Sequence, residues 1–143
     1  MGKKRIASKG ETGAGTEAGK TGGSQKKRQL LRGILYVEST YNNTRLTLTD
    51  EKGNTVAASS SGALGFKGAK KGTPFAAAKV GETIALRAQA FGLKEVAVVV
   101  KGVGSGRESS IRSFANKGFG LLSIRDATPV PHNGPRPPRP RRV

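Results

Sequence analysis

Two glycine-rich segments of the chain carry cationic side chains that could bind phosphate groups. Residues 61–72 read SGALGFKGAKKG, and residues 102–109 read GVGSGRES. Glycine lets backbone N–H groups come close to an anion, and a helix that begins after the second segment would add partial positive charge. Both segments therefore predict phosphate contacts, made by Lys67, Lys70 and Lys71 in the first and by Arg107, Ser109 and Arg112 in or just after the second.

Each of these interpretations has a simpler alternative that the residues leave open. The second segment could be a tight turn that needs glycine, because its GxGxG spacing differs from the GxGxxG of dinucleotide-binding loops. Phe66 could stack on a base or anchor its loop to the sheet. In the sequence YNNT, Asn42, Asn43 and Thr44 could read base edges and sugar hydroxyls or form an asparagine-rich turn.

The acidic residues and the single histidine do not form a pattern typical of an enzyme. A two-metal nuclease needs several carboxylates, but the first expected strand offers only Glu38 and the first expected helix only Glu82. His132 lies in a proline-rich tail, so a Ser–His–Asp triad is not expected. The chain has no cysteine, which excludes a thiol nucleophile and a Cys-ligated zinc. We expect no enzymatic activity, no metal and no cofactor.

The composition indicates a small domain with an anionic partner. A chain of 143 residues has room for one domain with tails. Lysine and arginine total 26 against 9 acids, which gives a formal net charge of +17. A protein this basic repels itself unless an anion neutralises it, and a nucleic acid is the natural partner. No apolar run approaches the length of a membrane helix, and the N-terminus lacks a secretory signal. We therefore expect a soluble, intracellular protein.

The order of predicted elements is βββαβαβ, which indicates a single α/β domain with a mixed five-stranded sheet and two helices. A meander followed by αβαβ is also the order of the ribonuclease-H-like fold. The apolar run over 95–100 predicts a strand covered on both sides, and Leu122 and Ile124 are expected on one face of the last strand. The expected strands are 33–40, 45–50, 54–60, 95–100 and 119–127, and the expected helices are 73–91 and a shorter one that ends near residue 116.

Both ends of the chain differ in composition from the middle. Residues 1–29 are rich in glycine and lysine and have almost no apolar side chains, so we expect a basic, disordered extension. Residues 30–128 form the predicted domain. Residues 129–143 hold six of the seven prolines and four arginines, which predicts an extended, polyproline-like tail.

Four motifs in this order resemble one protein family. They are YNNT with LTLTD, GFKGAKKGTPFAA, VKGVGSGRES and DATPVPHNGPRPPRPRR. Together they resemble the bacterial-type small-subunit ribosomal protein eleven family, from about residue 30 to the C-terminus. The family loop GPGPGRE reads GVGSGRE here, so this chain lacks two of its prolines.

This resemblance implies a ribonuclease-H-like fold without nuclease chemistry and a place on the platform of the small ribosomal subunit, in the cytoplasm. It implies that the protein bridges several helices of the small-subunit ribosomal RNA, beside the messenger-RNA exit path and the cleft of the Shine–Dalgarno duplex. The implied protein partners are small-subunit proteins seven and eighteen. The implied RNA-binding residues are Asn42, Asn43, Thr44, Lys67, Lys70, Lys71, Thr73, Arg107, Ser109, Arg112, His132, Asn133, Arg136, Arg139, Arg141 and Arg142.

Two other functions remain as alternatives. A nonspecific nucleic-acid-binding or chaperone-like protein could use the same charges without a defined site. A degenerate nuclease would cleave RNA in a metal-dependent way.

Asn133 is a possible isoaspartate site. Gly134 follows it and has no side chain to hinder attack of its own amide nitrogen on the Asn133 side-chain carbonyl.

Overall fold

The computed structural model describes residues 29–140 and 142. The extension predicted over residues 1–29 therefore lies outside the described residues, except for residue 29. The observed elements match the predicted order, with one short 3-10 helix, η1, added within the first glycine-rich segment. They are β1 (Arg32–Ser39), β2 (Thr44–Thr49), β3 (Thr55–Ser60), η1 (Gly68–Gly72), α1 (Pro74–Ala90), β4 (Glu95–Lys101), α2 (Gly106–Ala115) and β5 (Gly120–Asp126).

The five strands form one mixed sheet in the order β3-β2-β1-β4-β5. β2 is antiparallel to both β1 and β3, whereas β4 is parallel to β1 and β5 is parallel to β4. This arrangement is the ribonuclease-H-like topology, so the predicted fold class is confirmed. Four of the five strands point in the same direction, which brings their C-terminal ends to one edge of the sheet.

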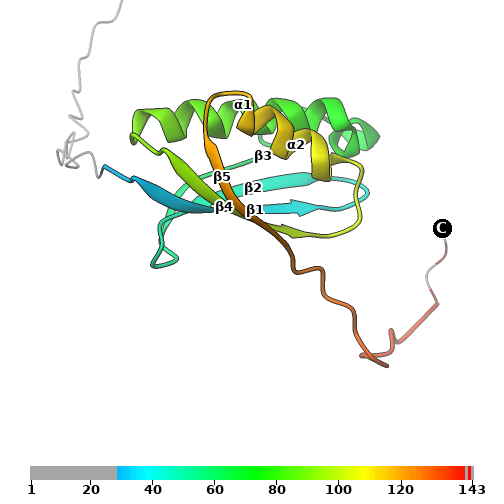
Figure 1. Ribbon diagram of the computed structural model, residues 1–143. Coiled ribbons are helices and arrows are strands. Elements are labelled where there is room, and N and C mark those ends of the chain that lie inside the picture. The colour runs from blue at the N-terminus through cyan, green and yellow to red at the C-terminus, as the bar shows by residue number, and fades with distance from the viewer. Residues whose placement is uncertain (1–28, 141, 143) are drawn as a thin grey trace, which may run out of the picture.

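Both helices lie on the same face of the sheet (Figure 1). The core forms between them and the sheet, and Val96, Val98 and Val100 of β4 are buried there. Ala97 and Val99, which alternate with them, are only half-buried. The prediction that this strand is covered on both sides is therefore wrong for the part of the chain that the structure describes. The connections β3-α1-β4 and β4-α2-β5 cross the sheet in the same direction, and right-handed crossovers in one direction place their helices on one face.

A β-bulge changes which side chains of β5 face the helices. The register between β4 and β5 shifts by one residue at Leu122. As a result Leu121 and Ile124, and not Leu122 with Ile124, line a cleft between β5 and α2. The predicted pairing of Leu122 and Ile124 on one face is wrong, because the bulge inserts one residue and breaks the two-residue alternation.

The start of α1 is set by local chemistry. The Thr73 hydroxyl accepts a hydrogen bond from the Ala76 N–H at 3.3 Å, and Pro74 occupies the first turn. A threonine cap followed by proline is a strong start signal for a helix. The helix ends before Gly92, which has a φ of +73°.

None of the helices among the described residues has the length and apolar character needed to cross a membrane.

Candidate nucleic-acid interface

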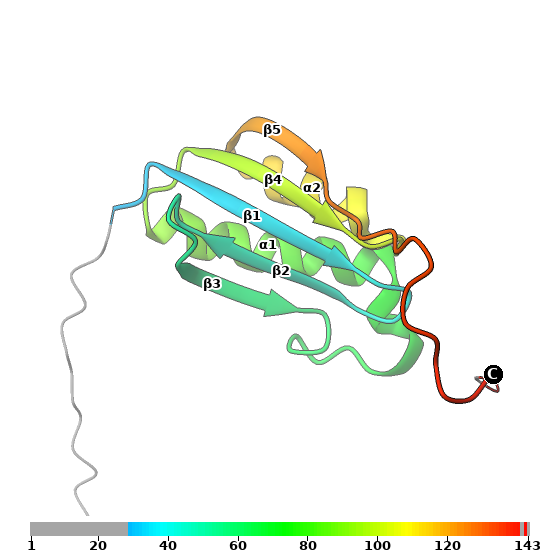
Figure 2. The same cartoon turned by 90° about the horizontal axis from the view of Figure 1, so that it is seen from below.

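The predicted binding segments gather at the edge where β1, β3, β4 and β5 end. Figure 2 shows that the β1–β2 turn, the β3–α1 connection, the β4–α2 loop and the C-terminal tail all leave the sheet there. The segments lie far apart in the sequence, so this gathering follows from the parallel strand directions. The edge is the candidate nucleic-acid interface.

Ser61 holds the first two segments of this edge together. Its side chain is fully buried, and its Oγ lies 2.7 Å from Asn43 Oδ1 and 2.7 Å from the Lys71 carbonyl oxygen. The same oxygen accepts a hydrogen bond from the Thr44 N–H at 3.1 Å. The side chain of Asn43 is therefore part of the protein's own hydrogen-bond network, whereas that of Asn42 is exposed. Thr44 is fully buried, so its side chain cannot reach a ligand as predicted.

Glycines allow the loops at this edge to pack directly on each other. A Cβ atom at Gly72 would lie 2.1 Å from the Tyr41 carbonyl oxygen, and one at Gly104 would lie 2.3 Å from the Thr40 carbonyl oxygen. Ser105 then donates a hydrogen bond from its hydroxyl to the Gly72 carbonyl at 2.8 Å. These contacts support the alternative in which the second glycine-rich segment is a tight turn that requires glycine.

The lysines of the first segment face outward. Lys67 and Lys70 are exposed and Lys71 is half-buried. None of the salt bridges between described residues includes them. Thr73 differs, because its hydroxyl donates to the Lys70 carbonyl at 2.7 Å and caps α1. The lysines are therefore available to an anionic partner, whereas the Thr73 hydroxyl is engaged in capping α1.

Phe66 contacts another ring of the protein. Its ring centroid lies 6.1 Å from that of Phe75 in an edge-to-face arrangement, and Phe66 is half-buried. This geometry favours the interpretation that Phe66 anchors the lysine-bearing loop. Phe75 is 63% exposed, so the aromatic pair lies at the protein surface.

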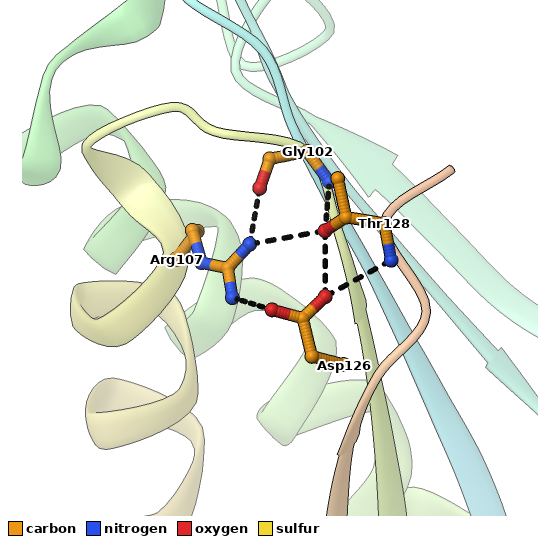
Figure 3. A network of polar contacts seen from close by, with 4 residues as sticks. All are labelled: Gly102, Arg107, Asp126 and Thr128. Atoms are coloured by element: carbon orange, nitrogen blue, oxygen red, sulfur yellow. Dashed lines mark hydrogen bonds and ion pairs between the residues drawn. The ribbon is translucent and has the colours of Figure 1, made fainter. Parts of the chain in front are cut away.

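Arg107 is turned toward the protein (Figure 3). Its Nη2 lies 2.5 Å from Asp126 Oδ2, and its Nη1 donates to the Gly102 carbonyl and to Thr128 Oγ1. Asp126 Oδ1 accepts from the Thr128 hydroxyl at 2.6 Å and from the Thr128 N–H at 2.9 Å. The Gly102 N–H donates to the Thr128 hydroxyl oxygen at 3.2 Å. We call these four residues the root network.

The root network stabilises the ionised form of Asp126. Hydrogen bonds from the Thr128 side chain and from Arg107 lower the pKa of Asp126 from its ordinary value of 3.8 to about 2.

The two other predicted RNA-binding residues of α2 differ in exposure. Ser109 is half-buried and its hydroxyl donates to the Gly106 carbonyl at 3.3 Å, whereas Arg112 is exposed and lines the cleft between α2 and β5.

The C-terminal tail leaves the domain without a helix or strand among its described residues. Residues 129–140 and 142 are exposed, and Asn133 has a φ of +55°. The tail candidates at described positions are thus all accessible to a partner, namely His132, Asn133, Arg136, Arg139 and Arg142. Arg141 lies outside the described residues.

Three further cations at this edge are absent from the predicted set of RNA-binding residues. Arg45 follows the first residue of β2, Lys101 ends β4, and Arg125 is the residue before the end of β5; all three are exposed. Glu38 of β1 stands between Arg45 and Lys101 in the register. A basic residue at an outward-facing position next to a loop would identify such cations. The facing of a strand residue follows from the strand register, which the sequence does not give.

The acids of the described residues form no metal site. No group of three histidine, aspartate or glutamate side chains comes together within residues 29–140 and 142.

The family described as "Ribosomal protein S11" matches residues 33–142, a range that contains the β1–β2 turn, both glycine-rich segments and the described tail. This match covers most of the chain and all of the candidate interface at this edge. The chain therefore belongs to the ribosomal protein S11 family.

Proposed function

We propose that this protein joins several helices of the small-subunit ribosomal RNA on the platform, beside the messenger-RNA exit path and the Shine–Dalgarno cleft. Membership of the S11 family makes the chain a structural component of the small ribosomal subunit that binds its RNA. The proposal adds the position on the subunit, the bridging role and two neighbours, small-subunit proteins seven and eighteen. The observation that carries it is the gathering of the basic segments at one edge of the sheet.

The proposed RNA contacts are the accessible members of the predicted set. The loop lysines place positive charge on the surface of the domain, and the tail arginines place it along the extended tail. An extended tail can pass between RNA helices where a folded domain would clash. The contacts are assigned to Asn42, Lys67, Lys70, Lys71, Arg112, His132, Asn133, Arg136, Arg139, Arg141 and Arg142, with Arg45, Lys101 and Arg125 added from the structure.

Five predicted contacts are assigned an indirect role. Their side chains are buried or bonded to other parts of the protein, as described above, so they support the exposed residues. These are Asn43, Thr44, Thr73, Arg107 and Ser109.

We also propose that the chain divides into an extension, a domain and a tail, over residues 1–29, 30–128 and 129–143.

Binding to a transcript of the small-subunit ribosomal RNA at several salt concentrations tests the proposal. If about 8 phosphates are neutralised, log K falls with log salt at a slope of roughly −6 to −7. The RNA should stay bound against excess random duplex RNA. Loss of the complex to this competitor would favour the nonspecific binder, and magnesium- or manganese-dependent cleavage of the transcript would favour the degenerate nuclease.

Sedimentation tests the same proposal in cell lysate. The tagged chain should travel with small subunits at both low and high salt. Replacement of Arg139, Arg141 and Arg142 by alanine should flatten the salt slope and reduce incorporation into subunits. An unchanged slope would show that the tail arginines do not neutralise phosphates.

We also propose that Asn133 converts to isoaspartate. The residue is exposed, and Gly134 follows it. The Gly134 backbone nitrogen attacks the Asn133 side-chain carbonyl and expels ammonia, and water then opens the resulting succinimide to aspartate or isoaspartate. Enzymatic isoaspartate detection on aged protein should give a signal that disappears in Gly134→Ala. Protein that retains only asparagine at this position would remove the proposal.

A further inference from the structure

The root network joins three parts of the chain at the point where the tail begins. Gly102 follows β4, Arg107 lies in the first turn of α2, and Asp126 ends β5. Thr128 stands directly before Pro129 and bonds to all three of these residues. The network therefore connects the body of the domain to the first residues of the tail.

This connection is the last one along the described chain. The Ala127 N–H donates to the Val100 carbonyl at 2.8 Å, and Thr128 makes the bonds given above. From residue 129 onward, the described tail makes no hydrogen bond or ion pair with the domain. The direction in which the tail leaves is thus set by the residues up to Thr128.

The composition of the tail makes this direction matter. Residues 129–140 contain six prolines, and each proline fixes its own φ and restricts the residue before it. A proline-rich chain is stiff over several residues. A change of angle at Thr128 therefore redirects the proline-containing stretch that follows it, whereas a fully flexible chain would lose the effect within a few residues.

We propose that Arg107 is a positioning residue that aims the C-terminal tail, through Asp126 and Thr128, at its RNA partner. The inference rests on the proposed function in that the tail is taken to bind RNA. Arg107 contributes little free charge to a phosphate, because Asp126 neutralises it at 2.5 Å. Its contribution is geometric: a tail that is already directed loses less conformational freedom when it binds.

The substitution Asp126→Asn separates this role from a direct phosphate contact. It removes a negative charge, so electrostatics alone predict tighter binding to RNA. If the root network directs the tail, binding of the ribosomal RNA transcript should instead weaken by about threefold to tenfold. Glu95→Gln is the matched control, because it also breaks an ion pair at 2.7 Å, with Arg32, but at the other end of β4. That variant should bind as the parent chain does or slightly tighter.

Arg107→Lys gives a second, independent comparison. Lysine keeps the positive charge but cannot reach Asp126, Gly102 and Thr128 with one planar group. The attraction of the positive charge to a phosphate would survive this change, whereas the root network would not. Binding equal to that of the parent chain would overturn the proposal, and a loss similar to that of Asp126→Asn would support it. Thermal unfolding of each variant identifies any that fail to fold.

A distance measurement without RNA tests the tail itself. The chain has no cysteine, so spin labels can be placed at Glu51→Cys in the β2–β3 turn and Arg136→Cys in the tail. The distance distribution should broaden in Asp126→Asn and in Arg107→Lys but not in Glu95→Gln. Superimposable distributions would overturn the positioning role and leave the proposed function intact. Broadening without any change in RNA affinity would also overturn the proposal, because it would show that the direction of the tail does not contribute to RNA binding.

Discussion

The two glycine-rich segments share a composition but differ in what their cations do. In residues 61–72 Lys67 and Lys70 are exposed, and the loop is held by Ser61 and the Phe66–Phe75 pair. In residues 102–109 the glycines pack against β1 and the turn after it, and Arg107 bonds to the end of β5 and the start of the tail. The first segment presents charge, and the second organises the chain around it.

This difference shows that glycine next to a cation does not by itself identify an anion site. The Gly102 and Gly104 N–H groups donate to Thr128 and to the Ser39 carbonyl, so they are occupied within the protein. What decides the role of each segment is whether an acid lies within reach of its cation. Arg107 has Asp126, and the loop lysines have no ion-pair partner among the described residues.

The largest effect should come from filling the space at Gly104. A Cβ there would lie 2.3 Å from the Thr40 carbonyl oxygen and 2.5 Å from Ser39 Oγ. Gly104→Ala should therefore lower the free energy of unfolding by about 1–3 kcal/mol, because the loop must move away from β1. Gly62→Ala in the first segment is the control, since its nearest neighbour is Lys71 Cδ at 3.6 Å. Chemical denaturation measures both, and equal stabilities would refute the packing role of the second segment.

The next effect concerns RNA affinity and not stability. Exchange of Lys67 and Lys70 for glutamine removes two exposed charges, so the salt slope of RNA binding should become shallower by about 1–2. The thermal midpoint should stay unchanged. Lys52 and Lys94, exposed lysines at the other end of the sheet, provide the control when both are exchanged for glutamine. If that double variant loses as much affinity, the charge acts through the whole molecule and not through this loop.

A smaller effect is expected at Phe66. Phe66→Ala removes an edge-to-face contact with Phe75, which is worth about 0.5–1.5 kcal/mol beyond the buried area. Hydrogen exchange should become faster over residues 62–71. Phe66→Leu keeps an apolar anchor, so its RNA affinity should stay within about twofold of the parent value. A large loss of affinity in Phe66→Leu with unchanged exchange would mean that the ring stacks on a base.

The smallest effect is the pH dependence of stability. The pKa of Asp126 falls from 3.8 to about 2 in the folded chain, so the unfolded chain binds more protons between these values. The stabilisation is fully present above the ordinary pKa and is lost as the pH falls through 4 toward 2. Acid unfolding of Asp126→Asn should lack this part of the pH dependence. The first segment contains no acid, so the Lys67 and Lys70 variants should keep the parent profile, and a changed profile would contradict the comparison.

Much of the fold could be predicted because its signals are local. Thr73 and Pro74 mark the start of α1, and the alternation of Leu46 and Leu48 with polar residues marks β2. The element order and the mixed five-stranded sheet are confirmed for the same reason. The sequence does not predict that both helices cover the same face of β4. A continuous apolar run does not reveal in which direction the connections before and after the strand cross the sheet. The bulge at Leu122 was missed because it appears only in the pairing with β4.

The candidate interface divides in the same way. The sequence alone identified the basic segments, the proline-rich tail and the family, since charge, glycine and motif order can be read along the chain. Only the tertiary structure decided which cations are free. Arg107 and Asp126 are separated by 19 positions in the sequence and meet because β4 and β5 end at the same edge as α2 begins. A side chain's partner depends on this spatial meeting, and no pattern within a single segment contains it.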